Sequence, residues 1–184
     1  IDFDQDGSVD FTLTSATDTN GNYGFGQLLV ADYDVIVTQP AGTAQTDDPD
    51  GGNDNIASLT LGDGENNVLQ DFGYRGTGSI GDIVFFDINN DGVLNGADRG
   101  VENVGVGLAI DVNGDSVADY TSLLQTDGSG NYLFPNLIPG DYIVSVNSTD
   151  LPDAMGAEPT VDADGIGTPN TSTLTLGADE NNLD

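Results

Sequence analysis

The residues best suited to chemistry lie in one short acidic loop, DINNDGVLNGAD, from Asp87 to Asp98. Its oxygen-bearing side chains fall at positions 1, 3, 5, 9 and 12, and a glycine stands at position 6, where such loops turn sharply. Calcium takes six to eight hard oxygen ligands, and this spacing wraps them around one point. An Asp/Asn-rich turn without a metal is the alternative. The expected Ca²⁺ ligands are Asp87, Asn89, Asp91, Asn95 and Asp98, with the carbonyl of Val93 at position 7.

A second kind of acidic loop occurs twice, as DFDQDGSVD and DVNGDSVAD. Each copy places oxygen ligands at positions 1, 3, 5 and 9, as short calcium loops do. A solvated hairpin with local Asx turns is the alternative, and Ser116 replaces the sixth-position glycine in the second copy. The candidate ligands are Asp2, Asp4, Asp6 and Asp10 in the first copy and Asp111, Asn113, Asp115 and Asp119 in the second.

Other carboxylates carry a weaker signal. Asp18 and Asp127 lie in TDxxGxY turns, and the pairs Asp48/Asp50 and Asp162/Asp164 lie in Gly-rich loops, where Asp is also an ordinary turn residue. Paired carboxylates could also serve a glycosidase. The chain has no Trp for a sugar-binding cleft, however, and the pairs sit in loops of calcium type. We therefore expect no enzymatic activity.

From the composition we expect a bound cation to balance the negative charge of the carboxylates. The 184 residues include 32 Asp and Glu but only two basic residues, Arg75 and Arg99, for a net charge of −30. Two carboxylates about 4 Å apart repel by roughly 4 kcal/mol near a protein surface. This charge argues against binding to nucleic acid or anionic membranes, because both attract basic patches. The absence of Cys, His and Lys removes disulfides, imidazole ligands and Lys–Asn isopeptide crosslinks.

The sequence repeats internally. Ile1–Val37 matches Ile110–Val146 without a gap, with 16 identities in 37 positions. LTLGDGENNV (Leu59–Val68) matches LTLGADENNL (Leu174–Leu183) after six extra residues. The first copy has no counterpart of Gly78–Ala109 within this chain, and the second ends at Asp184, where the DFGY of Asp71–Tyr74 would begin. We therefore expect two incomplete repeats, whose missing strands come from a longer array or from neighbouring molecules.

The apolar pattern has period two in short runs bounded by Gly, Asn and Asp, which predicts an all-β fold without helices. The recurring aromatic residues are expected to pack in the core and along strand edges. The expected strands are Val9–Thr14, Asn22–Gly26, Asp34–Thr38, Ile56–Leu61, Gln70–Tyr74, Ser79–Phe86, Val104–Val112, Asp119–Gln125, Asn131–Phe134, Asp141–Asn147 and Ser172–Leu176.

Three motif strings, GSIGDIVFFDINNDGVLNGADRGVENVGVGLAI, TDGSGNYLFPNLIPGDYIVSV and LTLGADENN, resemble the SdrD B-like domain family. The resemblance implies tandem immunoglobulin-like (B-type) β-sandwich domains, here residues 1–76, lacking their N-terminal strands, and 77–184, lacking the last strand. It also implies calcium ligands at Asp87, Asn89, Asp91 and Asp98, with Asp82 and Asp127 as possible contributors.

The same resemblance implies a rigid stalk or spacer, built of neighbouring repeats of one protein, at the cell surface or outside the cell. No apolar run is long enough to span a membrane. A subunit of an extracellular fibre, assembled with other copies by β-strand complementation, is the alternative.

Overall fold

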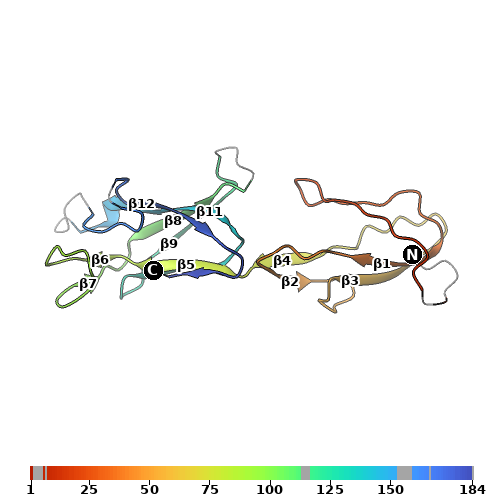
Figure 1. The fold of residues 1–184 in the computed structure, drawn as a ribbon, viewed down its shortest axis with the longest axis horizontal. Helices are drawn as coiled ribbons and strands as arrows, with labels where there is room; N and C mark the ends of the chain where they lie inside the picture. The colour runs from red at the N-terminus through yellow and green to blue at the C-terminus, as the bar shows by residue number, and fades with distance from the viewer. Residues whose placement is uncertain (2–5, 7, 113–116, 153–158, 166, 184) are drawn as a thin grey trace. The chain divides into compact units, whose positions relative to one another are not determined.

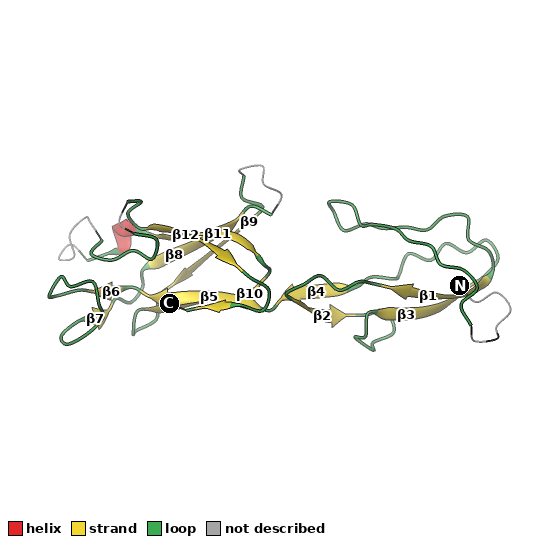
Figure 2. Ribbon diagram, viewed as in Figure 1, coloured by secondary structure: helices red, strands yellow, loops and turns green. Residues whose placement is uncertain are grey.

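The computed structural model describes residues 1, 6, 8–112, 117–152, 159–165 and 167–183. These residues form β-strands, connecting loops and one 3₁₀ turn, Ser148–Asp150, without an α-helix (Figures 1 and 2). The expected all-β class is therefore confirmed. No helix in this described part is long and apolar enough to cross a membrane.

The chain divides into two compact units. Unit 1 comprises Ile1–Pro40 and Gln45–Tyr74, and unit 2 comprises Ala41–Ala44 and Arg75–Asp184. We describe each unit by itself.

Unit 1 is built around one antiparallel pair of strands. Strand β1 (Ala31–Ile36) pairs with β3 (Ile56–Leu61), so that Ala31 lies opposite Leu61. Alternate residues of β1 face a small core, in which Ala31, Tyr33 and Leu61 are buried. The strands β2 (Thr43–Asp47) and β4 (Gly73–Gly76), whose residues are divided between the two units, form another two-stranded sheet. Strand β4 begins three residues later than the Gln70–Tyr74 segment predicted from sequence.

Two predicted strands of unit 1 are wrong. Val9–Thr14 and Asn22–Gly26 are not strands, and Figure 2 draws the described chain before β1 as loop. Their counterparts in unit 2 are the strands β9 and β10, each held by a neighbouring strand. A period-two pattern makes a strand only where a partner completes the ladder of hydrogen bonds. No strand pairs with these two segments in the described part of unit 1.

Unit 2 contains two main sheets, one of four strands in the order β12-β11-β8-β9 and one of three in the order β10-β5-β13. A short pair, β6 with β7, adds a hairpin. Most pairs are antiparallel, and β13 joins β5 in parallel. The strands are β5 (Gly78–Ile83), β6 (Phe85–Phe86), β7 (Arg99–Gly100), β8 (Gly105–Ile110), β9 (Tyr120–Gln125), β10 (Asn131–Leu137), β11 (Gly140–Val146), β12 (Thr171–Leu176) and β13 (Asn181–Asn182).

The core of unit 2 collects alternate residues from both sheets. Strand β8 contributes every second side chain, as expected for a strand with one face buried. This arrangement agrees with a β-sandwich of the B type. The buried cluster consists of Ile80, Val106, Leu108, Ile110, Phe134, Leu137, Tyr142, Val144 and Leu176.

Several local features recur in both units at the repeat spacing. The Asp18 carboxylate accepts the backbone N–H groups of Asn20 and Asn22, each at 2.8 Å. The Asp127 carboxylate accepts those of Ser129 and Asn131, at 2.8 and 2.9 Å. These turns therefore form by the same side-chain to backbone chemistry.

The strand pair after this turn also recurs. Tyr33 donates its hydroxyl to the Leu29 carbonyl at 2.7 Å, as Tyr142 does to the Ile138 carbonyl at 2.8 Å. The pair β11 and β12 starts with Gly140 opposite Leu176, in the same register as β1 and β3.

Candidate metal centre

The acidic loop of Asp87–Asp98 is the connection of a β-hairpin. It joins β6 to β7, whose pairing sets Phe86 opposite Arg99 and so brings the two ends of the loop together. The Arg99 guanidinium carbon lies 5.6 Å from the centre of the Phe86 ring. A cation this close to an aromatic face is attracted by the ring quadrupole, which helps to close the hairpin.

Backbone N–H groups hold the first carboxylate of the loop in place. Asp87 accepts the Gly92 N–H on Oδ2 at 2.9 Å and the Asp91 N–H on Oδ1 at 3.2 Å. The loop can fold back in this way because Gly92 has a φ of +74°, a conformation that glycine adopts without steric cost. Asn90, at φ +57°, takes the same left-handed region.

The last carboxylate ties the end of the loop to its beginning. Asp98 accepts the Ile88 N–H on Oδ1 and the Asn95 N–H on Oδ2, both at 2.9 Å. As a result, oxygens of Asp87, Asp91 and Asp98 all lie within 4.8 Å of one another. Ligands on opposite sides of a calcium ion are about 4.6 to 5.2 Å apart, because each bond is about 2.3 to 2.6 Å long. The three carboxylates therefore fit around one such ion.

The two amide side chains of the loop point to the same place. Asn95 donates Nδ2 to Asp91 Oδ2 at 2.9 Å and to the Val93 carbonyl at 3.0 Å, and Asn89 donates Nδ2 to Asp91 Oδ2 at 2.8 Å. These N–H groups place partial positive charge beside the Asp91 carboxylate and the Val93 carbonyl. Rotating either amide by half a turn exchanges nitrogen for oxygen, which would turn the same side chains into cation ligands.

The loop also favours the ionised form of its carboxyls. Desolvation acts to raise the pKa of Asp87, but hydrogen bonds from Gly92, Thr160, Asp91 and Asn90 together lower it. The pKa of Asp91 is lowered chiefly by its hydrogen bond from Asn95. Both groups are therefore charged at neutral pH, as a cation site requires.

A segment distant in sequence approaches the same loop. The backbone carbonyl of Thr160 lies next to Gly92, and the Thr160 side chain helps to lower the pKa of Asp87. Two residues after Thr160, burial and the charge of Asp164 raise the pKa of Asp162. Asp162 in turn acts on Tyr132 of β10, whose pKa is raised to about 12 by burial and by the charges of Asp82 and Asp162. Sequence analysis missed Thr160, since no pattern connects it to the loop.

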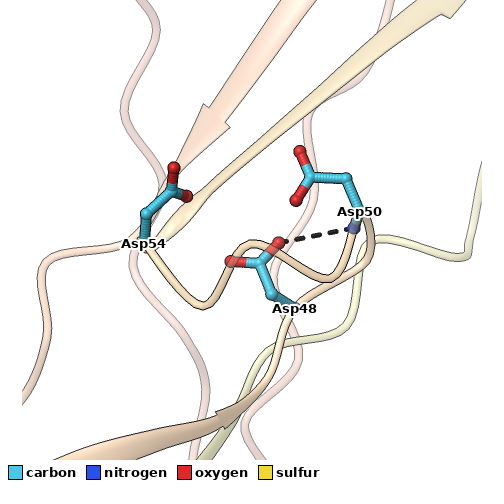
Figure 3. Close-up of side chains that lie close together, drawn as sticks. All are labelled: Asp48, Asp50 and Asp54. Carbon is cyan, nitrogen blue, oxygen red and sulfur yellow. Dashed lines mark hydrogen bonds between the residues drawn. The ribbon is translucent and has the colours of Figure 1, made fainter.

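A second group of carboxylates lies in unit 1, where oxygens of Asp48, Asp50 and Asp54 come within 4.8 Å of one another (Figure 3). Asp48 is only 5% exposed and accepts Gln45 Nε2 at 2.8 Å and the Asp50 N–H at 3.4 Å. This group could hold a cation. Sequence analysis marked Asp48 and Asp50 as a weak pair and missed Asp54, although the run DDPDGGND contains all three.

The remaining candidate ligands lie in the duplicated loops, which the structure describes only in part. Asp2, Asp4, Asn113 and Asp115 lie outside the described residues. Their described partners Asp6, Asp10, Asp111 and Asp119 belong to neither carboxylate group, and Asp119 accepts the Val112 N–H at 2.7 Å across the loop base. The duplicated loops thus remain predictions. The Asp18 and Asp127 carboxylates are likewise outside both groups and accept turn N–H groups.

Most of unit 2 matches a known domain family. A family model described as the SdrD B-like domain matches residues 78–184, which is more than half of the chain. The chain belongs to the SdrD B-like domain family. The suspected family is thereby confirmed, and the match covers the sandwich and the acidic hairpin loop of unit 2.

Two similar relatives are much longer proteins. Serine-aspartate repeat-containing protein F of Staphylococcus epidermidis is 33% identical over 181 residues, which is 93% of this chain and 10% of that protein. Colossin-A of Dictyostelium discoideum is 33% identical over 138 residues, which is 72% of this chain and 1% of that protein. The chain thus spans about a tenth of the length of the staphylococcal relative.

Proposed function

We propose that this chain is a calcium-stabilised structural repeat of an extracellular or cell-surface protein, where it acts as a rigid spacer. The observation that carries the proposal is the convergence of three carboxylates, one carbonyl and two amides inside the Asp87–Asp98 loop. Membership of a family of structural repeats supports a mechanical role rather than an enzymatic one. The similarity to a small part of very long relatives supports a role as one element of an array.

The proposed domains are residues 1–76 and 77–184, each a B-like repeat. Support comes from the recurrent Asp turn, the recurrent Tyr hydroxyl bond and the shared strand register of the two units. In this arrangement, neighbouring repeats are the partners of each domain.

Calcium would act here by neutralising and crosslinking the loop. The ligands would be Asp87, Asp91 and Asp98, with the amide oxygens of Asn89 and Asn95 and the carbonyl of Val93. A ligand that binds only the folded state at 100 times its dissociation constant adds about 2.7 kcal/mol to the free energy of unfolding. The bound ion would also fix the hairpin between β6 and β7, which stiffens this end of unit 2.

Calorimetric titration of the chain with calcium, paired with thermal denaturation, tests the proposal. We expect saturable binding and a melting temperature that excess chelator lowers. Asp87→Asn should weaken binding at the loop by at least about tenfold, because it removes one charged ligand. Asp63→Ala is the matched control: it also removes one carboxylate, but from an exposed turn whose counterpart is already Ala178. The proposal would be contradicted if excess chelator did not change the melting temperature, or if the two variants weakened calcium binding equally.

A further inference from the structure

Three asparagines of the chain are followed directly by glycine, and two of these pairs lie in described loops. They are Asn20–Gly21, in the turn organised by Asp18, and Asn95–Gly96, inside the Asp87–Asp98 loop. The third, Asn113–Gly114, lies outside the described residues. An asparagine side chain can react with the backbone nitrogen that follows it, and glycine hinders this reaction least because it has no Cβ. The two described pairs can therefore be compared as reactive sites.

The backbone nitrogens of the two glycines differ in their hydrogen bonds. The Gly21 N–H donates to the Asp18 carbonyl at 3.0 Å. Among the described residues, none accepts a hydrogen bond from the Gly96 N–H. A hydrogen bond made by the protonated form of a group opposes the loss of its proton. The nitrogen of Gly96 is therefore the more available nucleophile.

The surroundings of Gly96 leave room for a reaction. Gly96 has a φ of +55°, and a Cβ built there would meet no atom within 4 Å. Asn95 and Gly96 are both exposed, so that water reaches the bond between them. Gly21 is equally open, with no atom within 4 Å of a Cβ built there. The hydrogen bond of the glycine nitrogen is therefore the feature that distinguishes the two sites.

The turn around Gly96 is held by other groups. The Asn95 N–H donates to Asp98 Oδ2, and the Asp98 N–H donates to the Asn95 carbonyl, each at 2.9 Å. These two bonds fix both ends of the turn and leave the Gly96 nitrogen unoccupied. The loop thus keeps Asn95 and Gly96 in an exposed turn without protecting the reacting nitrogen.

We propose that Asn95 is a site of spontaneous deamidation, which converts it to aspartate or isoaspartate. The Gly96 nitrogen gives its proton to water and bonds to Cγ of Asn95. The bond from Cγ to Nδ2 then breaks, and the amide nitrogen takes a proton from water and leaves as ammonia.

The cyclic succinimide formed in this way is opened by water. Attack at Cγ breaks the new bond to the Gly96 nitrogen and gives aspartate. Attack at the main-chain carbonyl carbon of Asn95 breaks the original peptide bond and gives isoaspartate, in which the chain runs through Cγ. The whole reaction consumes one water and releases one ammonia, and nothing is oxidised or reduced.

This conversion changes the charge and the contacts of the acidic loop. Nδ2 of Asn95 donates to Asp91 Oδ2 at 2.9 Å and to the Val93 carbonyl at 3.0 Å. Aspartate has no N–H to donate there, and its negative charge repels that of Asp91. Isoaspartate also lengthens the main chain by one carbon, which moves the ligands on either side of it. Both products therefore destabilise the cation-free loop.

Timed mass spectrometry of the full 184-residue chain tests the proposal. The chain is incubated at neutral pH in excess chelator, so that the result does not depend on calcium. Trypsin cleaves after its two basic residues, Arg75 and Arg99, and places each Asn–Gly pair in a different peptide. Deamidation at Asn95 should proceed at least about fivefold faster than at Asn20, because the hydrogen bond of Gly21 must open first. Hydroxylamine, which cleaves a chain at a succinimide, should likewise cut faster after Asn95 than after Asn20.

Three controls separate the effect of the fold from that of the local sequence. In concentrated urea both turns are lost, and Asn20 and Asn95 should react at similar rates. Asp18→Ala removes the carboxylate that accepts the Asn20 and Asn22 N–H groups, so it should speed deamidation at Asn20 and leave that at Asn95 unchanged. Asn95→Gln, whose longer side chain does not readily form the succinimide ring, should abolish the reaction at this position.

Two results would overturn the proposal. One is an equal rate of deamidation at Asn20 and Asn95 in the folded chain. The other is an Asn95 that reacts in urea but stays intact in the folded chain, because the loop would then protect it.

The consequence for cation binding rests on the proposed function and has its own measurement. Asn95→Asp, which reproduces the aspartate product, should melt at a lower temperature than the wild type in chelator and gain more from added calcium. A gain no larger than that of the wild type would count against calcium binding at this loop, whereas the timed reaction in chelator decides whether Asn95 deamidates.

Discussion

A single carboxylate organises the turn between β9 and β10. Asp127 accepts the backbone N–H groups of Ser129 and Asn131 and the side-chain amide of Asn131. These bonds, that from the Asn131 backbone foremost, lower the pKa of Asp127 below its ordinary value of 3.8. The ionised side chain therefore contributes more to the folded state than the protonated one.

This carboxylate should make stability depend on pH at the acid end. Because the folded-state pKa is the lower one, its contribution is present above the unfolded pKa near 3.8 and is lost as pH falls through the folded pKa. We expect Asp127→Asn to be less stable than the wild type at pH 7, with the difference shrinking below about pH 4. Urea denaturation at stepped pH measures it, with Asp63→Ala as the control. A difference that stays constant with pH would contradict the assignment.

At the residue scale, the approach of carboxylates to one another could be predicted from sequence in the Asp87–Asp98 loop. The twelve-residue spacing predicts the mutual approach of Asp87, Asp91 and Asp98, since a short chain with Gly92 at its turn has few ways to place them. Thr160 could not be found in this way, because its approach to Gly92 of the loop depends on how a segment distant in sequence folds. Spacing rules describe local geometry and carry no information on such tertiary contacts.

At the scale of elements, the tyrosine on β11 fastens that strand to the turn before it. Tyr142 is 2% exposed and donates its hydroxyl to the Ile138 carbonyl at 2.8 Å. Tyr142→Phe should keep the packing of the ring but lose this hydrogen bond, which lowers the free energy of unfolding by about 1 kcal/mol. Tyr120→Phe on β9, at a position 54% exposed, is the matched control and should change it little. Urea denaturation midpoints of the two variants measure this difference. Equal midpoints would contradict a stabilising role for the Tyr142 hydroxyl.

The strands show where a period-two pattern suffices and where it fails. β3 is predicted at its observed bounds, Ile56–Leu61, and β9 within one residue, because each lies beside a partner strand in the same unit. Val9–Thr14 has the pattern of β9 but no counterpart of β8 to pair with among the described residues. Alternation records which residues suit a sheet face, whereas pairing depends on a neighbour that the segment itself does not specify.

At the scale of the whole molecule, the unbalanced charge is the dominant electrostatic property. A net charge of −30 with only two Lys and Arg leaves repulsion between carboxylates unopposed by basic side chains. Bound calcium would reduce this repulsion at the loops, and dissolved salt reduces it everywhere. The two effects differ in range, because salt screens over a length of about 30 Å at 0.01 M and about 8 Å at 0.15 M.

Monovalent salt should therefore stabilise the chain most when calcium is absent. In excess chelator, raising sodium chloride from about 0.01 to 0.15 M should raise the melting temperature by several degrees, because screening weakens repulsion more in the compact folded state than in the expanded unfolded chain. In saturating calcium the same step should raise it less, since the closest carboxylates are already neutralised. Differential scanning calorimetry in the four conditions measures both shifts. An equal salt effect with and without calcium would show that the ion does not bind where the carboxylates converge, and a salt effect of opposite sign would show that charge repulsion does not limit the stability of this fold.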